Sequence, residues 1–194
     1  MIIGITGGSG SGKTTLLQQI QKAGGLVLDC DAIYHDLLKT DKRLLAAIDS
    51  RFPGCVTEAG LDRKKLGAIV FADPAALQDL NRITHSAVKQ QVLQVLETKP
   101  SLVAIDAIGL FEGGLAELCH TTVAVIADPQ LRVQRLIARD GITEAYARNR
   151  IGAQPSNDHF RKICDHTLEN NTTAEDFQKK VFALLTQLGI IKEN

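Results

Sequence analysis

The sequence has no excess of either charge, no closely paired cysteines and no long apolar run. Lysine plus arginine equals aspartate plus glutamate at 22 each in 194 residues, so it lacks the basic surplus typical of proteins that bind nucleic acids or anionic membranes. Its cysteines form no CxxC pair, which argues against a zinc site or a disulfide framework. No apolar run approaches the about 20 residues of a membrane span, and no basic segment leads into an apolar one as in a signal peptide. These absences predict a soluble protein of the reducing cytoplasm that binds small molecules, without nucleic acid or membrane as a partner.

Short apolar runs alternate with helical patterns along much of the chain. The runs at 2–6, 26–29, 102–106 and 122–127 are typical of buried parallel strands. The segments 13–24, 74–97 and 174–188 carry the spacing of amphipathic helices. This alternation predicts an α/β fold with a parallel sheet flanked by helices, and the length and 44% hydrophobic content suit a single domain over 1–194.

One long interval interrupts the alternation. From 31 to about 100 the sequence shows helical segments and turn signals but no strand pattern. We interpret 31–100 as an inserted helical subdomain between the second and third strands.

The stretch GITGGSGSGKTT, at 4–15, contains Gly7, four residues and then Gly12-Lys13-Thr14, which satisfies the phosphate-loop pattern GxxxxGK[ST]. An apolar strand precedes it and a helix follows, so backbone N–H groups and the helix N-terminus would converge on one anion. Lys13 would reach the β- and γ-phosphates of ATP, and the Thr14 hydroxyl would bind Mg²⁺. The residues predicted to bind the nucleotide are Gly8, Ser9, Gly10, Ser11, Gly12, Lys13, Thr14 and Thr15.

Three carboxylates follow predicted strands and are candidates for phosphoryl-transfer chemistry. Asp29 and Asp31 come at the end of the second strand, where ligands bind in open α/β sheets. In an extended segment these two would point to opposite faces, so one of them would face the phosphates. Alternatively, Asp31 caps a helix over 32–38 and Asp29 ties down a loop. Asp106, at the end of the third strand, is placed to hold magnesium.

The stretch DAIG, at 106–109, also matches the DxxG pattern of GTPase switches. A GTPase should carry an NKxD guanine-reading motif as well, and the sequence contains no Asn-Lys pair. This absence removes most of the support for a nucleotide-dependent switch module.

Basic residues gather late in this otherwise neutral chain. Seven of them lie between 132 and 162, against only Asp140, Glu144 and Asp158. The cluster favours a lid that faces phosphate; the alternative is a pair of solvated helices. The basic residues are Arg132, Arg135, Arg139, Arg148, Arg150, Arg161 and Lys162.

With these motifs in order, the chain resembles the dephospho-coenzyme A kinases. LDCDAI is similar to the family's D-A-D segment, THSAVKQQ to its L-x-H-P helix and DAIGLFEGG to its P-L-L-F-E stretch. RVQRLIARDGITEAYARNRIGAQ is similar to the family's Q-x-x-R-x-x-x-R-D…R-I-x-x-Q lid, and CDHTLENN to its A-D-x-x-I-x-N ending. The resemblance implies a P-loop kinase with a helical coenzyme A-binding subdomain over 31–100 and a lid at about 139–162.

The resemblance also implies a reaction, ATP-dependent phosphorylation of the ribose 3′-hydroxyl of dephospho-coenzyme A, with Mg²⁺. Asp31 would be the general base or the group that orients the hydroxyl. Arg139 would stabilise the transferring charge beside Lys13, and Asp106 would hold the metal with Thr14. His85 and Glu112 would bind the acceptor with Asp31; a structural role for His85 is the alternative.

The chain departs from the family pattern near segments that would face the acceptor. It carries Ser86 for proline, Ile108-Gly109 for P-L, Arg132 for the lid glutamine and Cys164 for alanine. These departures leave the acceptor open, and a nucleoside or other small-molecule kinase is the alternative.

Overall fold

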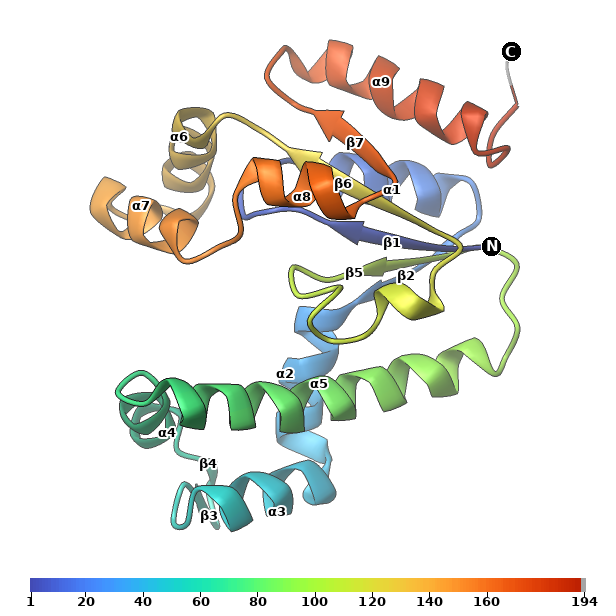
Figure 1. The fold of residues 1–194 in the computed structure, drawn as a ribbon. Coiled ribbons are helices and arrows are strands. Elements are labelled where there is room, and N and C mark those ends of the chain that lie inside the picture. The colour runs from blue at the N-terminus through green and yellow to red at the C-terminus, as the bar shows by residue number, and fades with distance from the viewer. Residues whose placement is uncertain (193–194) are drawn as a thin grey trace. The chain divides into compact units, whose positions relative to one another are not determined.

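The computed structural model describes residues 1–192, which form two compact units. We call the first the core unit; it comprises Met1–Val27, Pro100–Leu110 and the chain from Leu118 onward. The second, the helical unit, comprises Leu28–Lys99 and Phe111–Glu117. Figure 1 shows the elements of both units.

A five-stranded sheet runs in the order β2-β5-β1-β6-β7 (Figure 1). Strand β1 pairs in parallel with β5 and β6, and β6 pairs in parallel with β7. The predicted parallel sheet is confirmed, but β7 was not predicted. Only one residue of β7 is buried, so this outer strand lacks the apolar run that marks the others. The strands are β1 (Ile2–Thr6), β2 (Leu26–Asp29), β5 (Val103–Asp106), β6 (Thr121–Ile126) and β7 (His166–Glu169).

Helices pack on the sheet through the alternating side chains of its strands. Leu16 of α1 and Phe177 of α9 join Val123 and Val125 of β6 in one apolar cluster, whereas Phe160 of α8 packs on Ile126. Successive strand residues point to opposite faces, so these contacts place helices on both sides of the sheet. The helices of the core unit are α1 (Lys13–Lys22), α6 (Pro129–Asp140), α7 (Glu144–Gly152), α8 (Asn157–Ile163) and α9 (Ala174–Gln187). The short 3₁₀ helix η1 spans Ala116–Leu118.

The helical unit has an apolar core of its own. Leu38, Ile48, Phe52 and Leu66 from successive helices are buried together in it. The expectation that 31–100 contains no strand is wrong, because strands β3 and β4 form a small antiparallel hairpin. Each has two residues, too few for an alternating pattern to show in the sequence. The elements are α2 (Cys30–Thr40), α3 (Lys42–Arg51), β3 (Val56–Thr57), β4 (Gly60–Leu61), α4 (Arg63–Val70) and α5 (Pro74–Leu96).

The longest helix, α5, has 23 residues and carries charged and amide side chains along its length. Neither α5 nor any other helix within residues 1–192 is long and apolar enough to cross a membrane.

Candidate active site

Helix α1 begins differently from the other α-helices in the described part of the chain. Each of the others has an Asp, Ser or Thr side chain that accepts a hydrogen bond from an N–H of its own first turn. Helix α1 has Gly12 at this position, with φ of 103° and no side-chain cap. Apart from the Thr15 N–H, which bonds the Gly12 carbonyl, the donors of its first turn are therefore available to an anion, which the positive end of the helix dipole also favours.

The glycine loop before α1, residues 7–12, is held from outside by side chains distant in sequence. Arg132 Nε donates to the Ser9 carbonyl at 2.9 Å, and Asn170 Nδ2 donates to the Ser11 carbonyl at 2.8 Å. In a trans peptide the C=O of one residue and the N–H of the next point in opposite directions. The bonds made by Arg132 and Asn170 therefore turn the N–H groups of Gly10 and Gly12 away from these side chains.

Two positions of the loop, Gly8 and Gly12, have no space for a side chain because Arg132 and Asn170 approach them closely. A Cβ on Gly8 would collide with the Arg132 guanidinium and with Gln154. A Cβ on Gly12 would collide with the Asn170 amide, and the φ of Gly12 also lies in the left-handed region. Glycine at positions 8 and 12 is thus explained by the side chains that pack against these positions, as well as by the room that phosphate needs.

Lys13 and Asp106 meet beside the loop. Lys13 Nζ donates to the Gly7 carbonyl at 2.9 Å and lies 3.8 Å from Asp106 Oδ1. Both side chains are mostly buried, with exposures of 16% and 17%. Parallel pairing of β1 and β5 puts Asp106 opposite Ile5, directly before the loop. Thr14 is exposed in the first turn of α1, so an ammonium, a carboxylate and a hydroxyl are available at one end of the sheet.

A buried network joins Arg132 and Gln154 to Ser9. Arg132 Nη2 donates to Gln154 Oε1 at 2.6 Å, and the same oxygen accepts the Ser9 N–H at 2.9 Å. Gln154 Nε2 donates to Ser9 Oγ at 2.8 Å. Burial lowers the pKa of the Arg132 guanidinium from its usual high value.

The other arginines of the basic stretch fall into two groups, one that bonds backbone carbonyls at the loop and one that bonds carboxylates. Arg135 contacts the loop, through the Gly10 carbonyl at 3.4 Å and the Asn170 carbonyl at 3.0 Å. Arg139 instead bonds to its neighbour Asp140, with Nε 2.6 Å from Oδ1. This hydrogen bond, together with the nearby charges of Arg139 and Arg150, lowers the pKa of Asp140. The remaining exposed pairs involve Arg148, Arg150 and Arg161.

Asp29 and Asp31 have different local roles in the helical unit. Asp29 ends β2 and caps α2, accepting the Ala32 N–H at 3.0 Å. Asp31 is exposed in the first turn of α2. The expectation that both lie in an extended segment is wrong because the helix begins at Cys30, and the alternative that Asp31 is the cap is wrong because Asp29 occupies that position.

The two other predicted acceptor residues lie elsewhere in the helical unit. His85 is half-buried on α5, and Glu112 is exposed in the segment Phe111–Glu117. No hydrogen bond or ion pair within residues 1–192 joins Asp31, His85 and Glu112. The family resemblance named these three residues together, and their joint role in acceptor binding stays a prediction.

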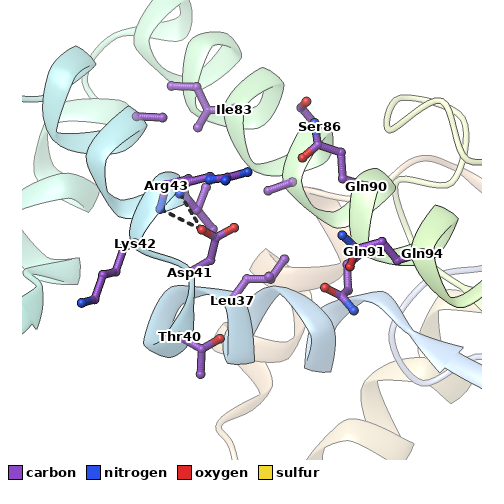
Figure 2. A pocket seen from close by; sticks show the side chains of 13 residues that line it. Leu37, Thr40, Asp41, Lys42, Arg43, Ile83, Ser86, Gln90, Gln91 and Gln94 are labelled. Atoms are coloured by element: carbon purple, nitrogen blue, oxygen red, sulfur yellow. Dashed lines mark hydrogen bonds between the residues drawn. The ribbon is translucent and has the colours of Figure 1, made fainter.

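The helical unit also contains two hollows. The larger, about 500 Å³, lies among α2, α3 and α5 and is shown in Figure 2; Ser86 and three glutamines of α5 line it, with neither Asp31 nor His85. The smaller, about 190 Å³, is lined by Tyr34, His35, Arg63, Phe71, Gly67 and aliphatic side chains. Burial raises the pKa of the Tyr34 phenol, partly offset by the positive charge of Arg63, so the phenol is neutral near pH 7.

Four residues that hold the loop were not predicted as site residues: Arg132, Arg135, Gln154 and Asn170. All lie within motifs that carry the family resemblance, but their spacing gives no sign that they converge on residues 7–12. Pairing of β6 with β7 brings Asn170 there, and its own N–H bonds the Ile126 carbonyl.

The fold and the loop together define the class: a strand, a glycine loop and an uncapped helix on a parallel sheet make this a P-loop phosphate-binding protein. Residues 1–176 match the family model described as dephospho-CoA kinase. The chain belongs to this family, as the sequence motifs predicted.

Individual relatives agree. The dephospho-CoA kinase of Lactobacillus johnsonii is 33% identical over 193 residues, covering 96% of this chain and 98% of that protein. The crystal structure of TT1252 from Thermus thermophilus is 33% identical, with a TM-score of 0.80 over 97% of each chain. A dephospho-CoA kinase from Campylobacter jejuni, 22% identical with a TM-score of 0.67 over 96% of each chain, shares the fold.

Proposed function

We propose that this chain transfers the γ-phosphoryl group of ATP to the ribose 3′-hydroxyl of dephospho-coenzyme A, giving coenzyme A and ADP. Membership of the family supports this reaction. The observation that carries it is the uncapped N-terminus of α1 behind a glycine loop, with Lys13 3.8 Å from Asp106. We place the reaction in the cytoplasm, in keeping with the spacing of the cysteines.

On the donor side, N–H groups of the segment 8–15 cradle the phosphates of ATP, other than those of Ser9, Ser11 and Thr15, which bond acceptors within the protein. Lys13 contacts the β- and γ-phosphates. On nucleotide binding Lys13 exchanges its bond to the Gly7 carbonyl for phosphate oxygens. Its charge then opposes the negative charge that develops on the transferring group.

Magnesium fits the oxygen donors present at this end of the sheet. Thr14 supplies a hydroxyl and Asp106 a carboxylate, whereas no group of three or more acidic, histidine or cysteine side chains within residues 1–192 could hold a metal. Mg²⁺ is commonly bound by one or two protein ligands together with water and substrate phosphates. When bound with ATP it would neutralise charge on the phosphates.

On the acceptor side, Asp31 is the proton acceptor or orienting group for the 3′-hydroxyl. It is exposed in the first turn of α2, whereas Asp29 is committed to the cap. We assign 31–100 to acceptor binding, with His85 and Glu112 as further contacts.

The smaller hollow suits the adenine of the acceptor. Tyr34 lies three residues after Asp31 on α2, hence on the same helix face, and Phe71 is 85% exposed at the rim. Adenine is joined to the ribose that receives the phosphoryl group, so a site for the ring one turn from the proton acceptor matches the acceptor's own geometry. The rings of Tyr34 and Phe71 supply stacking surfaces.

Arg139 and the lid at about 139–162 complete the proposed site. Arg139 exchanges Asp140 for the transferring phosphoryl group, and closure of the lid excludes water that would otherwise compete as acceptor. Helices α6 and α7 pack together through Leu136 and Ala147.

The test is a panel of acceptors with Mg²⁺ and ATP, monitored by ADP release and product mass. Dephospho-coenzyme A should give coenzyme A with the highest kcat/KM. Turnover with a nucleoside but none with dephospho-coenzyme A would support the alternative kinase, and absence of ADP release with every acceptor would overturn both.

A further inference from the structure

Arg132 is a charged side chain in a position where charge is unusual. It is 3% exposed, although it lies on α6 among arginines that reach solvent. A buried cation is strongly disfavoured unless an anion compensates for its lost hydration. The partners of Arg132 therefore decide what it can do.

Those partners are neutral. The guanidinium donates to the Ser9 carbonyl and to Gln154 Oε1, and no carboxylate within residues 1–192 forms an ion pair with it. By contrast, a carboxylate lies within 3.4 Å of each of four other arginines of the stretch, Arg139, Arg148, Arg150 and Arg161. Arg132 is thus hydrogen-bonded but lacks a compensating charge.

The position of this charge is set by the glycine loop. Arg132 lies so close to Gly8 that any Cβ there would collide with it, and its bond to the Ser9 carbonyl aims the Gly10 N–H to the opposite side of that peptide. The Ser11 hydroxyl, in the same loop, is buried and has no hydrogen-bond partner within residues 1–192. The loop and the guanidinium together therefore favour the binding of an anion.

We propose that Arg132 is a positioning residue for the nucleotide phosphates: it orients the Ser9–Gly10 peptide and supplies a buried positive charge that the bound polyphosphate compensates. The residue is one at which the chain departs from the family's lid glutamine, so the contribution distinguishes this chain from a glutamine-bearing relative. The inference rests on the proposed nucleotide binding at the loop, and it does not depend on the acceptor.

This role has a signature that a purely structural role lacks. Without ligand, the uncompensated charge lowers the stability of the folded protein; with polyphosphate bound, the same charge raises it. Replacement by glutamine keeps an amide donor for the Ser9 carbonyl but removes the charge. It should therefore leave the ligand-free melting temperature equal or higher and make the increase caused by ligand smaller.

The experiment measures ADP and pyrophosphate binding by calorimetry, and melting temperature with and without each ligand, for the full chain and for Arg132→Gln. We expect both dissociation constants to rise roughly tenfold, equivalent to about 1.4 kcal/mol. Lys179→Gln is the matched control, because it removes one positive charge from an exposed ion pair on α9 in the same unit; its dissociation constants should match those of the parent chain.

Other outcomes would overturn the inference. If Arg132→Gln binds both ligands within twofold of the parent chain, Arg132 contributes nothing to phosphate binding. If it melts lower without ligand but shows the full ligand-induced increase, the residue is structural. Failure of the parent chain to bind ADP would instead count against the proposed function.

A second variant covers the case in which Arg132→Gln does not fold. Arg132→Lys keeps the charge but cannot span two acceptors with a planar fork. We expect a loss of about threefold in ADP affinity from the misoriented peptide, an order-of-magnitude figure for one weakened hydrogen bond. Parent-like affinity in this variant would overturn the positioning role.

Discussion

The phosphate loop and the acceptor side of the proposed site are built in different ways. Residues 7–12 are fixed by hydrogen bonds from side chains 123 to 159 residues further along the chain. Asp31 and Glu112 are exposed, and no hydrogen bond or ion pair within residues 1–192 joins either to His85. The loop is thus held in place by the protein itself, whereas the residues proposed to bind the acceptor have few restraints.

This difference agrees with the chemistry expected of each half. A polyphosphate is bound by backbone donors, which are effective only when held at fixed directions. Under the proposed function, a nucleotide acceptor would be bound mainly by side chains of the helical unit, and side chains can adjust on binding. Substitutions in the loop should therefore change catalysis strongly, and most substitutions on the acceptor side should change KM.

Lys13→Ala should have the largest effect. It removes the ammonium beside Asp106 and the charge that opposes the transferring phosphoryl group, so kcat and kcat/KM should both fall, by roughly 10³. Steady-state kinetics with ATP and dephospho-coenzyme A measure this. Lys22→Ala, in the exposed last turn of the same helix, should be unchanged. A rise confined to KM for ATP would mean that Lys13 only binds the ground state.

Asp31→Asn should have the next largest effect. It tests whether Asp31 accepts the proton of the acceptor hydroxyl. Loss of the proton acceptor should lower kcat by about 10² while ADP affinity is retained. Asp36→Asn, exposed on the same helix, is the matched control. If kcat is unchanged, the role passes to another carboxylate, Asp29 or Asp106.

A substitution of Asp29 tests whether this carboxylate stabilises the fold or takes part in catalysis. Its carboxylate accepts the Ala32 N–H, so Asp29→Ala should lower the free energy of unfolding by about 1 kcal/mol. A loss of kcat beyond the unfolded fraction would contradict the purely capping role.

The sequence was sufficient for those parts of the fold and site that rest on local pattern. Strands β1 and β2 begin and end where the apolar runs predicted, and the glycine loop lies before α1 as its motif required. Strand β7 and the β3–β4 hairpin were missed because their residues carry too few buried positions to form a pattern.

Contacts between distant segments could not be read from the sequence. Arg132 and Arg139 occupy the same helix and look equivalent in a basic cluster, yet one is buried against Ser9 and the other bonds to Asp140. Which face of α6 meets the loop depends on tertiary packing. The same holds for Asn170, which reaches Ser11 only because β7 joins the sheet beside β6.

Phe71→Ala probes the smaller hollow and should act on KM alone. Loss of a stacking surface for adenine should raise KM for dephospho-coenzyme A roughly fivefold, corresponding to about 1 kcal/mol, with kcat within twofold. Ile69→Ala is the control, because Ile69 lies in the last turn of α4, two residues before Phe71, and outside the hollow. A KM that is unchanged in Phe71→Ala would remove the hollow from the acceptor site.

Asp165→Asn should have the smallest effect, on stability and not on catalysis. Asp165 Oδ2 accepts hydrogen bonds from the Thr122 N–H and hydroxyl, both at 2.8 Å, and these bonds lower the pKa of the carboxyl. Because the folded pKa lies below the unfolded value of about 3.9, the stabilisation is fully present above that pH. It is lost as the pH falls through the folded pKa.

The measurement is urea unfolding of the parent chain and Asp165→Asn between pH 7 and pH 3. At pH 7 the variant should be less stable by about 0.5 kcal/mol, the low end of the range for a hydrogen bond, because the carboxylate is largely exposed. The difference should shrink below about pH 4 as the carboxyl of the parent chain becomes protonated. Asp158→Asn, which breaks only an exposed ion pair, should differ little from the parent at any pH. A difference for Asp165→Asn that persists unchanged at pH 3 would show that the ionised carboxylate is not what stabilises the junction of β6 and β7.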